Sequence, residues 1–110
     1  MAQAIDERIE QFRRDVLPRL VQQFRPSKVL AFGSRVRGDA LKDSDLDVLI
    51  VSEAFRGVRW LDRPVGVMQE CDIRLGVELL CYTPEEYERK LGELGIVRTA
   101  NDEGMELLVT

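Results

Sequence analysis

Apolar residues recur every three or four positions along the first part of the chain, as in a helix with one buried face. The repeat consists of Ile5, Ile9, Phe12, Val16, Leu20 and Phe24. Four arginines fall mostly on the opposite side and are expected to face solvent, namely Arg8, Arg13, Arg14 and Arg19. Pro18 lies inside the repeat, and because proline lacks a backbone N–H, we expect the helix to kink or split there.

Short apolar runs further along the chain predict buried strands at residues 28–32, 46–51 and 77–82. A last strand is predicted at residues 105–109, entered through Gly104. The segment between the first two runs, residues 35–41, fits a short helix or a turn.

Three helices are predicted after the second strand: one before the third strand and two between the third and the last. Residues 55–70 read as a helix broken near Pro64. A second helix begins after Thr83, because Thr83 is a good cap, proline follows it, and Glu86 stands three residues after it. The third helix is predicted at residues 96–103. The order predicts one α/β (α+β) domain over residues 1–110, with a mixed sheet of about four strands packed against helices.

Composition is typical of a globular protein large enough for one hydrophobic core, with 110 residues of which 45% are hydrophobic. No apolar run approaches the roughly 20 residues of a membrane span, and no signal-peptide pattern is present. Cys71 and Cys81 have neither metal-ligand nor redox spacing. We therefore expect a cytoplasmic protein with reduced core thiols and no membrane partner.

Two absences narrow the chemistry. The chain has no histidine, which excludes Ser-His-Asp and Cys-His catalysis and every histidine-ligated zinc site. The net charge of −4 gives no bulk attraction for a nucleic acid backbone, so nucleic acid is not an expected partner. Any phosphate must be bound by local groups.

Asp45 and Asp47 stand at the beginning of the second predicted strand. Residues two apart in a strand point to one face, so these carboxylates repel each other unless a cation lies between them. Carboxylate oxygens on one face suit Mg²⁺, and two such ions would serve phosphoryl or nucleotidyl transfer. The alternative is that the two aspartates only solvate the end of the strand.

Gly33 and Ser34 directly follow the first predicted strand. Glycine allows close approach of a phosphate, serine offers a hydroxyl, and Arg35 and Arg37 add charge nearby. Arg37 has a second interpretation, in which it caps the turn by pairing with an aspartate at position 39 or 43. The Walker Gly-Lys-Ser/Thr pattern is absent, and a calcium loop starting at residue 43 lacks its glycine and its final glutamate.

The spacing of Gly33-Ser34 and Asp45-Leu46-Asp47, with Arg37-Gly38 and Ser44 between them, resembles the "GSxxRG…SDxD" signature of the nucleotidyltransferase superfamily that includes DNA polymerase beta. The short chain resembles its minimal nucleotidyltransferases. The "YTPEEYE" segment after the third strand and the Glu-Gly pair before the last are also similar to that family.

The resemblance implies transfer of a nucleoside monophosphate from ATP or another NTP to a hydroxyl, with two Mg²⁺ ions as cofactor. The nucleotide phosphates would be bound by Gly33, Ser34, Arg35, Arg37 and Ser44. Asp45 and Asp47 would be catalytic metal ligands. Glu78 occupies the position of a third carboxylate, usually aspartate, that also holds metal and helps to deprotonate the acceptor. Its added methylene puts the activity of this chain in question, and Asp72 is a weaker substitute because it precedes the strand.

The resemblance also implies a partner protein, because so small a domain has little surface for an acceptor. Family members often accompany a small helical HEPN protein, and some are type VII-like antitoxins that add AMP to that toxin. The chain could then form a hetero-oligomer or a homo-oligomer. Two alternatives stay open: an inert module that neutralises its partner by contact, and transfer to a small molecule.

Overall fold

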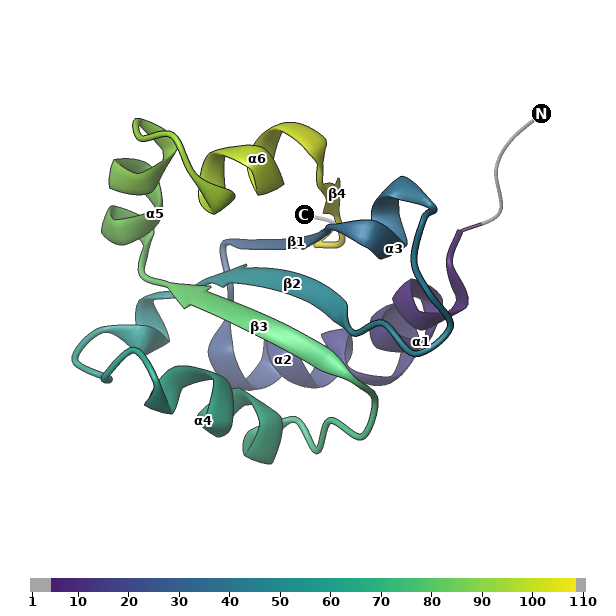
Figure 1. The fold of residues 1–110 in the computed structure, drawn as a ribbon. Helices are drawn as coiled ribbons and strands as arrows, with labels where there is room; N and C mark the ends of the chain where they lie inside the picture. Colours follow the sequence, from purple (N-terminus) through teal and green to yellow (C-terminus); the bar gives the residue numbers. More distant parts are fainter. Residues whose placement is uncertain (1–4, 109–110) are drawn as a thin grey trace.

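A four-stranded mixed sheet forms the centre of the computed structural model, which describes residues 5–108 (Figure 1). The strand order is β3-β2-β1-β4. The strands are β1 (Lys28–Phe32), β2 (Leu46–Val51), β3 (Val77–Tyr82) and β4 (Met105–Glu106). β2 runs parallel to β3, whereas β1 is antiparallel to both β2 and β4. The predicted α+β class and the mixed sheet of four strands are confirmed.

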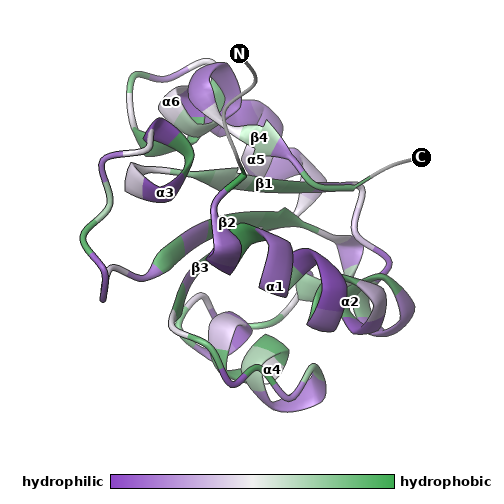
Figure 2. Cartoon of the chain, turned by 90° about the vertical axis from the view of Figure 1, so that its right-hand side faces the viewer, coloured by the Kyte–Doolittle hydropathy of each residue, from purple (hydrophilic) through white to green (hydrophobic). Residues whose placement is uncertain are grey.

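Helices cover both faces of this sheet. On one face lie α1 (Glu7–Asp15), α2 (Leu17–Phe24) and α4 (Asp62–Glu70), and on the other α5 (Pro84–Leu91) and α6 (Ile96–Glu103) (Figure 1). The short helix α3 (Ser34–Arg37) follows β1 directly. Hydropathy follows these layers, since the strands are largely hydrophobic and α1 is largely hydrophilic on its outer side (Figure 2).

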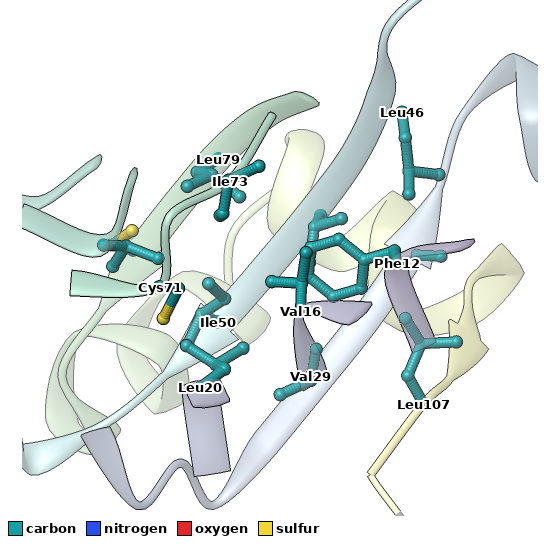
Figure 3. Packing of buried hydrophobic residues seen from close by; sticks show 14 of the residues in the cluster. Phe12, Val16, Leu20, Val29, Leu46, Ile50, Cys71, Ile73, Leu79 and Leu107 are labelled. Atoms are coloured by element: carbon teal, nitrogen blue, oxygen red, sulfur yellow. The ribbon is translucent and has the colours of Figure 1, made fainter. Parts of the chain in front are cut away.

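The sheet separates two groups of buried side chains. Phe12, Val16 and Leu20 point from the first helices toward Val29 and Ile50 of the sheet (Figure 3). A smaller group on the opposite face joins the strands to α5 and α6 and comprises Leu30, Phe32, Leu49, Val51, Tyr82, Tyr87, Val97 and Ala100. Because side chains alternate along a strand, odd-numbered residues of β2 face α5 and α6.

Three local signals in the sequence have the predicted effect. The first helix is split, with α1 ending at Asp15 and α2 carrying Pro18 in its first turn, where a missing N–H costs nothing. Thr83 and Glu86 form a complete capping box at the start of α5. Both cysteines are buried and free, as expected.

Two predicted boundaries are wrong. Residues 55–70 do not form a helix broken at Pro64, because α4 begins at Asp62 and places the proline in its first turn; a short 3₁₀ helix, η1 (Glu53–Phe55), and a turn precede it. β4 is shorter than predicted and ends at Glu106, although the Leu107 backbone N–H still donates to the Val29 carbonyl at 2.8 Å. The last predicted position, residue 109, lies outside the described residues.

One ion pair fastens the α4 side of the sheet to α5. Arg63 is only 7% exposed, and its guanidinium contacts the Glu86 carboxylate at 2.6 Å. It also donates to the carbonyls of Val58 at 2.8 Å and Cys81 at 3.1 Å. Hydrogen bonds from Arg63 are the largest cause that lowers the pKa of Glu86, to about 2.

In residues 5–108, no helix is long and apolar enough to cross a membrane.

Candidate active site

The predicted carboxylates lie where three strand ends meet. In the sheet register Asp47 is opposite Phe32, the last residue of β1, on one side and Glu78 of β3 on the other. Asp47 is half-buried, whereas Glu78 is exposed. By strand alternation both side chains lie on the face of the sheet that α5 and α6 cover.

Asp47 lies directly against the turn that follows β1. A Cβ atom added to Gly33 would overlap the Asp47 carboxylate oxygen Oδ2, and Gly33 has φ +80°, in the left-handed region. Only glycine permits both this backbone conformation and this close approach. The Gly33-Ser34 turn and the Asp47 carboxylate are therefore neighbours. One bound nucleotide could contact both only if they lie this close.

Asp45 approaches the neighbouring strand in a similar way. A Cβ on Gly76, the residue before β3, would lie 2.5 Å from Asp45 Oδ1. The Leu46 backbone N–H donates to the Gly76 carbonyl at 3.0 Å, so the β2–β3 pairing extends to this point. Asp45 is the residue directly before β2, and its negative charge is one of the causes that raise the pKa of Asp47.

The pKa of the Asp47 carboxyl is raised above its usual range. Burial is the largest cause, followed by the negative charge of Glu78, hydrogen bonding with Glu78 and the charge of Asp45. The Arg37 guanidinium acts in the opposite direction. Excess negative charge at a partly buried carboxylate is the electrostatic condition that a bound cation relieves.

The carboxylates are not already gathered around a metal position. Within residues 5–108, no three His, Cys, Asp or Glu side chains lie close enough together to hold a metal ion as they stand. Mg²⁺ commonly takes one or two carboxylates and completes its coordination with substrate phosphates and water. Asp45 and Asp47 fit that pattern, with the phosphates supplied by a nucleotide.

A cavity of about 170 Å³ adjoins the carboxylates. Its lining combines acidic and apolar side chains, and consists of Phe32, Asp47, Glu78, Leu80 and Ile96. A larger hollow of about 360 Å³ lies elsewhere, beside α1, α2 and the turn after α4. There Asp72 forms ion pairs with Arg74 at 3.2 Å and with Arg19 at 3.9 Å. The Asp72 carboxylate is therefore already neutralised by arginines of the protein. We therefore place the candidate site at the smaller cavity.

Of the two arginines predicted to bind phosphate, Arg37 is the more exposed. It is exposed and makes one weak ion pair, from Nε to Asp39 Oδ2 at 3.3 Å. Its effect on the pKa of Asp47 shows that its charge acts at the site. Both interpretations of Arg37, as a cap for the turn and as a phosphate ligand, are compatible with this position.

Arg35 and Ser44 both make contacts within the protein. The Arg35 side chain is 11% exposed and pairs with Asp6 at 3.1 Å. Arg35 also donates to the Ser44 carbonyl from Nε at 3.1 Å and from Nη2 at 2.9 Å. The Ser44 hydroxyl accepts a hydrogen bond from the Leu41 backbone N–H at 3.1 Å. These contacts hold the loop before Asp45.

Two residues near the site were not found from the sequence. Asp6 caps α1 and binds Arg35, and Arg8 donates from Nη1 to the Gly76 carbonyl at 3.3 Å. Arg8 was expected to be a solvent-facing residue of the first helix. Neither contact has a sequence signal, because the partners lie far away along the chain.

Comparisons with known proteins identify the family and agree with the fold. The family model described as "Nucleotidyltransferase domain" matches residues 13–102. The chain is 33% identical over 94 residues to the "Probable protein adenylyltransferase MntA" of Haemophilus influenzae, covering 83% of this chain and 82% of that protein. A solved structure from Sulfolobus solfataricus, described as a "putative nucleotidyltransferase", matches with a TM-score of 0.55 and 25% identity, covering 81% of this chain and 82% of the other. This chain therefore belongs to the nucleotidyltransferase domain family and is a nucleotidyltransferase.

Proposed function

We propose that this protein transfers AMP from ATP to a hydroxyl group of a partner protein in a reaction that depends on Mg²⁺. The observation that carries the proposal is the contact between the Asp47 carboxylate and the Gly33 backbone. It brings a metal ligand and a phosphate-binding turn within reach of one bound nucleotide. The name of the Haemophilus influenzae relative supports protein as the acceptor class.

Asp45 and Asp47 would hold Mg²⁺, which would neutralise the phosphate charge and orient the attacking and leaving oxygens. Gly33 presents backbone to the triphosphate, Ser34 contributes its hydroxyl, and Arg37 supplies a positive charge that can turn away from its exposed aspartate partner. The raised pKa of Asp47 supports this assignment, because the negative charge there is unbalanced without a cation.

In the proposed reaction the acceptor oxygen attacks the α-phosphorus of ATP. A new phosphorus–oxygen bond forms, the bond to the β-phosphate bridging oxygen breaks, and pyrophosphate leaves with the electron pair. Glu78 accepts the proton of the acceptor hydroxyl, since it lies beside Asp47 on the cavity wall. The apolar side of that cavity would exclude water from the acceptor oxygen.

The acceptor would be a small helical HEPN protein, and this chain its antitoxin. The resemblance to minimal nucleotidyltransferases motivates that partner, and the small size of the domain supports it. We place the reaction in the cytoplasm, where ATP and reduced thiols coexist.

The test incubates the chain with α-³²P-labelled ATP, Mg²⁺ and the product of the neighbouring gene. We expect label on that product and a loss of at least about 100-fold in Asp47→Ala. Asp43→Ala is the matched control, because Asp43 lies in the exposed loop before the strand. A partner that binds tightly but takes no label from the wild-type chain would refute the transfer and favour neutralisation by contact.

A further inference from the structure

We infer that Arg35 is a positioning residue, which fixes the Asp45 carboxylate relative to Asp47 and does not bind phosphate. The inference rests on the proposed function, since it concerns the same metal-binding carboxylates. It also departs from the role that the sequence suggested for this arginine.

All the donors of Arg35 are directed at the protein. Nε and one Nη2 hydrogen meet the Ser44 carbonyl, and Nη2 also reaches the Lys42 carbonyl at 2.8 Å. Nη1 contacts both carboxylate oxygens of Asp6, at 3.1 and 3.4 Å. A guanidinium has five N–H donors in a fixed planar fork, and each of the three nitrogens of Arg35 already donates to a protein oxygen.

The loop from Asp39 to Asp45 depends on this arginine. Its backbone has neither helix nor strand, and Leu41 at its tip is 78% exposed. Ser44 directly precedes Asp45, so holding the Ser44 carbonyl fixes the point from which the Asp45 side chain projects. Metal sites tolerate displacements of only about 0.5 Å, which makes such support necessary.

A second route of contacts reaches Asp45 from the opposite side. Asp6, the partner of Arg35, caps α1 by accepting from the Arg8 backbone N–H at 2.8 Å. The Arg8 side chain donates to the Gly76 carbonyl, and Gly76 lies against Asp45 Oδ1. Arg35, Asp6, Arg8 and Gly76 thus close a ring of contacts around Asp45, which we term the Asp45 brace.

The experiment compares Arg35→Lys, Arg35→Met and Asp6→Asn with the wild-type chain. Lysine keeps the charge but loses the fork, and asparagine keeps the helix cap but loses the ion pair. Arg14→Met is the matched control, because Arg14 is exposed and pairs only with its neighbour Asp15. Three quantities are measured: Mn²⁺ affinity by electron paramagnetic resonance in the presence of a non-hydrolysable ATP analogue, kcat and KM for ATP at saturating Mg²⁺, and amide hydrogen exchange of residues 39–45.

We expect Arg35→Met and Arg35→Lys to weaken Mn²⁺ binding by about 10- to 100-fold and to lower kcat by a similar factor. KM for ATP should change little, exchange in residues 39–45 should accelerate, and Asp6→Asn should show the same changes more weakly. If Arg35 binds phosphate, lysine should rescue most activity, methionine should mainly raise KM, and exchange should stay as in the wild type. That pattern would overturn the inference.

Gly76→Ala keeps the test decisive if the Arg35 variants fold poorly. Its Cβ would displace the Asp45 carboxylate without touching Arg35, so we expect the same loss of Mn²⁺ affinity and kcat. Unchanged Mn²⁺ affinity in a folded Gly76→Ala chain would contradict the brace. Failure of the wild-type chain to bind Mn²⁺ would refute the proposed function, and the inference with it; wild-type binding that all variants retain would refute the inference alone.

Discussion

The Asp47 carboxylate carries an unfavourable negative charge in the folded protein, and it is also a proposed metal ligand. Three negative or dehydrating influences act on it, namely burial, Glu78 and Asp45, and only Arg37 opposes them. A carboxyl whose pKa is raised in the folded state stabilises the fold while it is protonated. That contribution is fully present below the pKa of the unfolded chain and is lost as pH rises through the folded pKa.

Asp47→Asn should therefore unfold at a higher temperature than the wild-type chain at pH 7 in metal-free buffer. The substitution removes the unbalanced charge, and the difference should shrink as pH falls toward 4 and the wild-type carboxyl becomes protonated. Circular dichroism melts between pH 4 and 8 measure it, with Asp43→Asn as control. A lower melting temperature for Asp47→Asn at pH 7 would show that a favourable partner of the carboxylate has been overlooked.

Gly33→Ala should lower transfer activity by at least about 100-fold and destabilise the fold by about 1–3 kcal/mol. The added Cβ meets Asp47 Oδ2, and alanine is strained at φ +80°. Urea unfolding and the labelling assay report the two effects. Gly66→Ala is the control, because Gly66 lies in α4 with nothing within 4 Å of a new Cβ, and it should be neutral or stabilising. Equal behaviour of the two variants would refute the close contact.

At the scale of the elements, sequence patterns predict what local chemistry determines. β2 and β3 have the predicted bounds because their apolar runs are bordered by polar or turn residues, and α5 starts at the predicted cap. The segment before α4 was misread because Pro64 is compatible with a first helical turn as well as with a break. The roles of Arg35 and Arg8 depend on contacts across the fold, which no local pattern encodes.

The Arg63–Glu86 pair supports a separate prediction about acid stability. Hydrogen bonds from Arg63 lower the pKa of Glu86 to about 2, so its contribution is present above the unfolded value and lost as pH falls toward 2. Glu86→Gln should cost about 2 kcal/mol at pH 7, and the difference should narrow below pH 4. Glutamine can still accept at the capping box, so the change removes the charge and the hydrogen bond from Arg63 Nη2 to Oε2. Urea unfolding at pH 7 and below pH 4 measures the difference in the free energy of unfolding between the two chains. A difference that does not change with pH would contradict the lowered pKa of Glu86.

At the scale of the whole molecule, one small sheet presents the ends of three strands to a single cavity. The Gly33-Ser34 turn follows β1, Asp45 directly precedes β2, Asp47 lies in β2 and Glu78 in β3, while α5 and α6 cover the adjoining face. The antiparallel β1–β2 pairing places the end of one strand beside the beginning of the next, and the parallel β3 brings its own beginning to the same place.

Mg²⁺ and ATP together should raise the melting temperature of the whole chain by several degrees. A ligand that binds only the folded state at about 100 times its Kd contributes about 2.7 kcal/mol. Each ligand alone should have a smaller effect, because the cation and the phosphates complete one another's site. Differential scanning fluorimetry measures the shift, with EDTA as the reversal. The same shift in an Asp45→Ala, Asp47→Ala double variant would place ATP binding elsewhere.

The most direct measurement is a crystal structure of the chain with Mn²⁺ and a non-hydrolysable ATP analogue. Anomalous scattering from manganese locates the ion. We expect a manganese peak bound by carboxylate oxygens of Asp45 and Asp47. The triphosphate should lie along Gly33 and Ser34, with Arg35 still paired to Asp6. Manganese absent from the two aspartates while the nucleotide is bound, or a triphosphate remote from the Gly33-Ser34 turn, would contradict it.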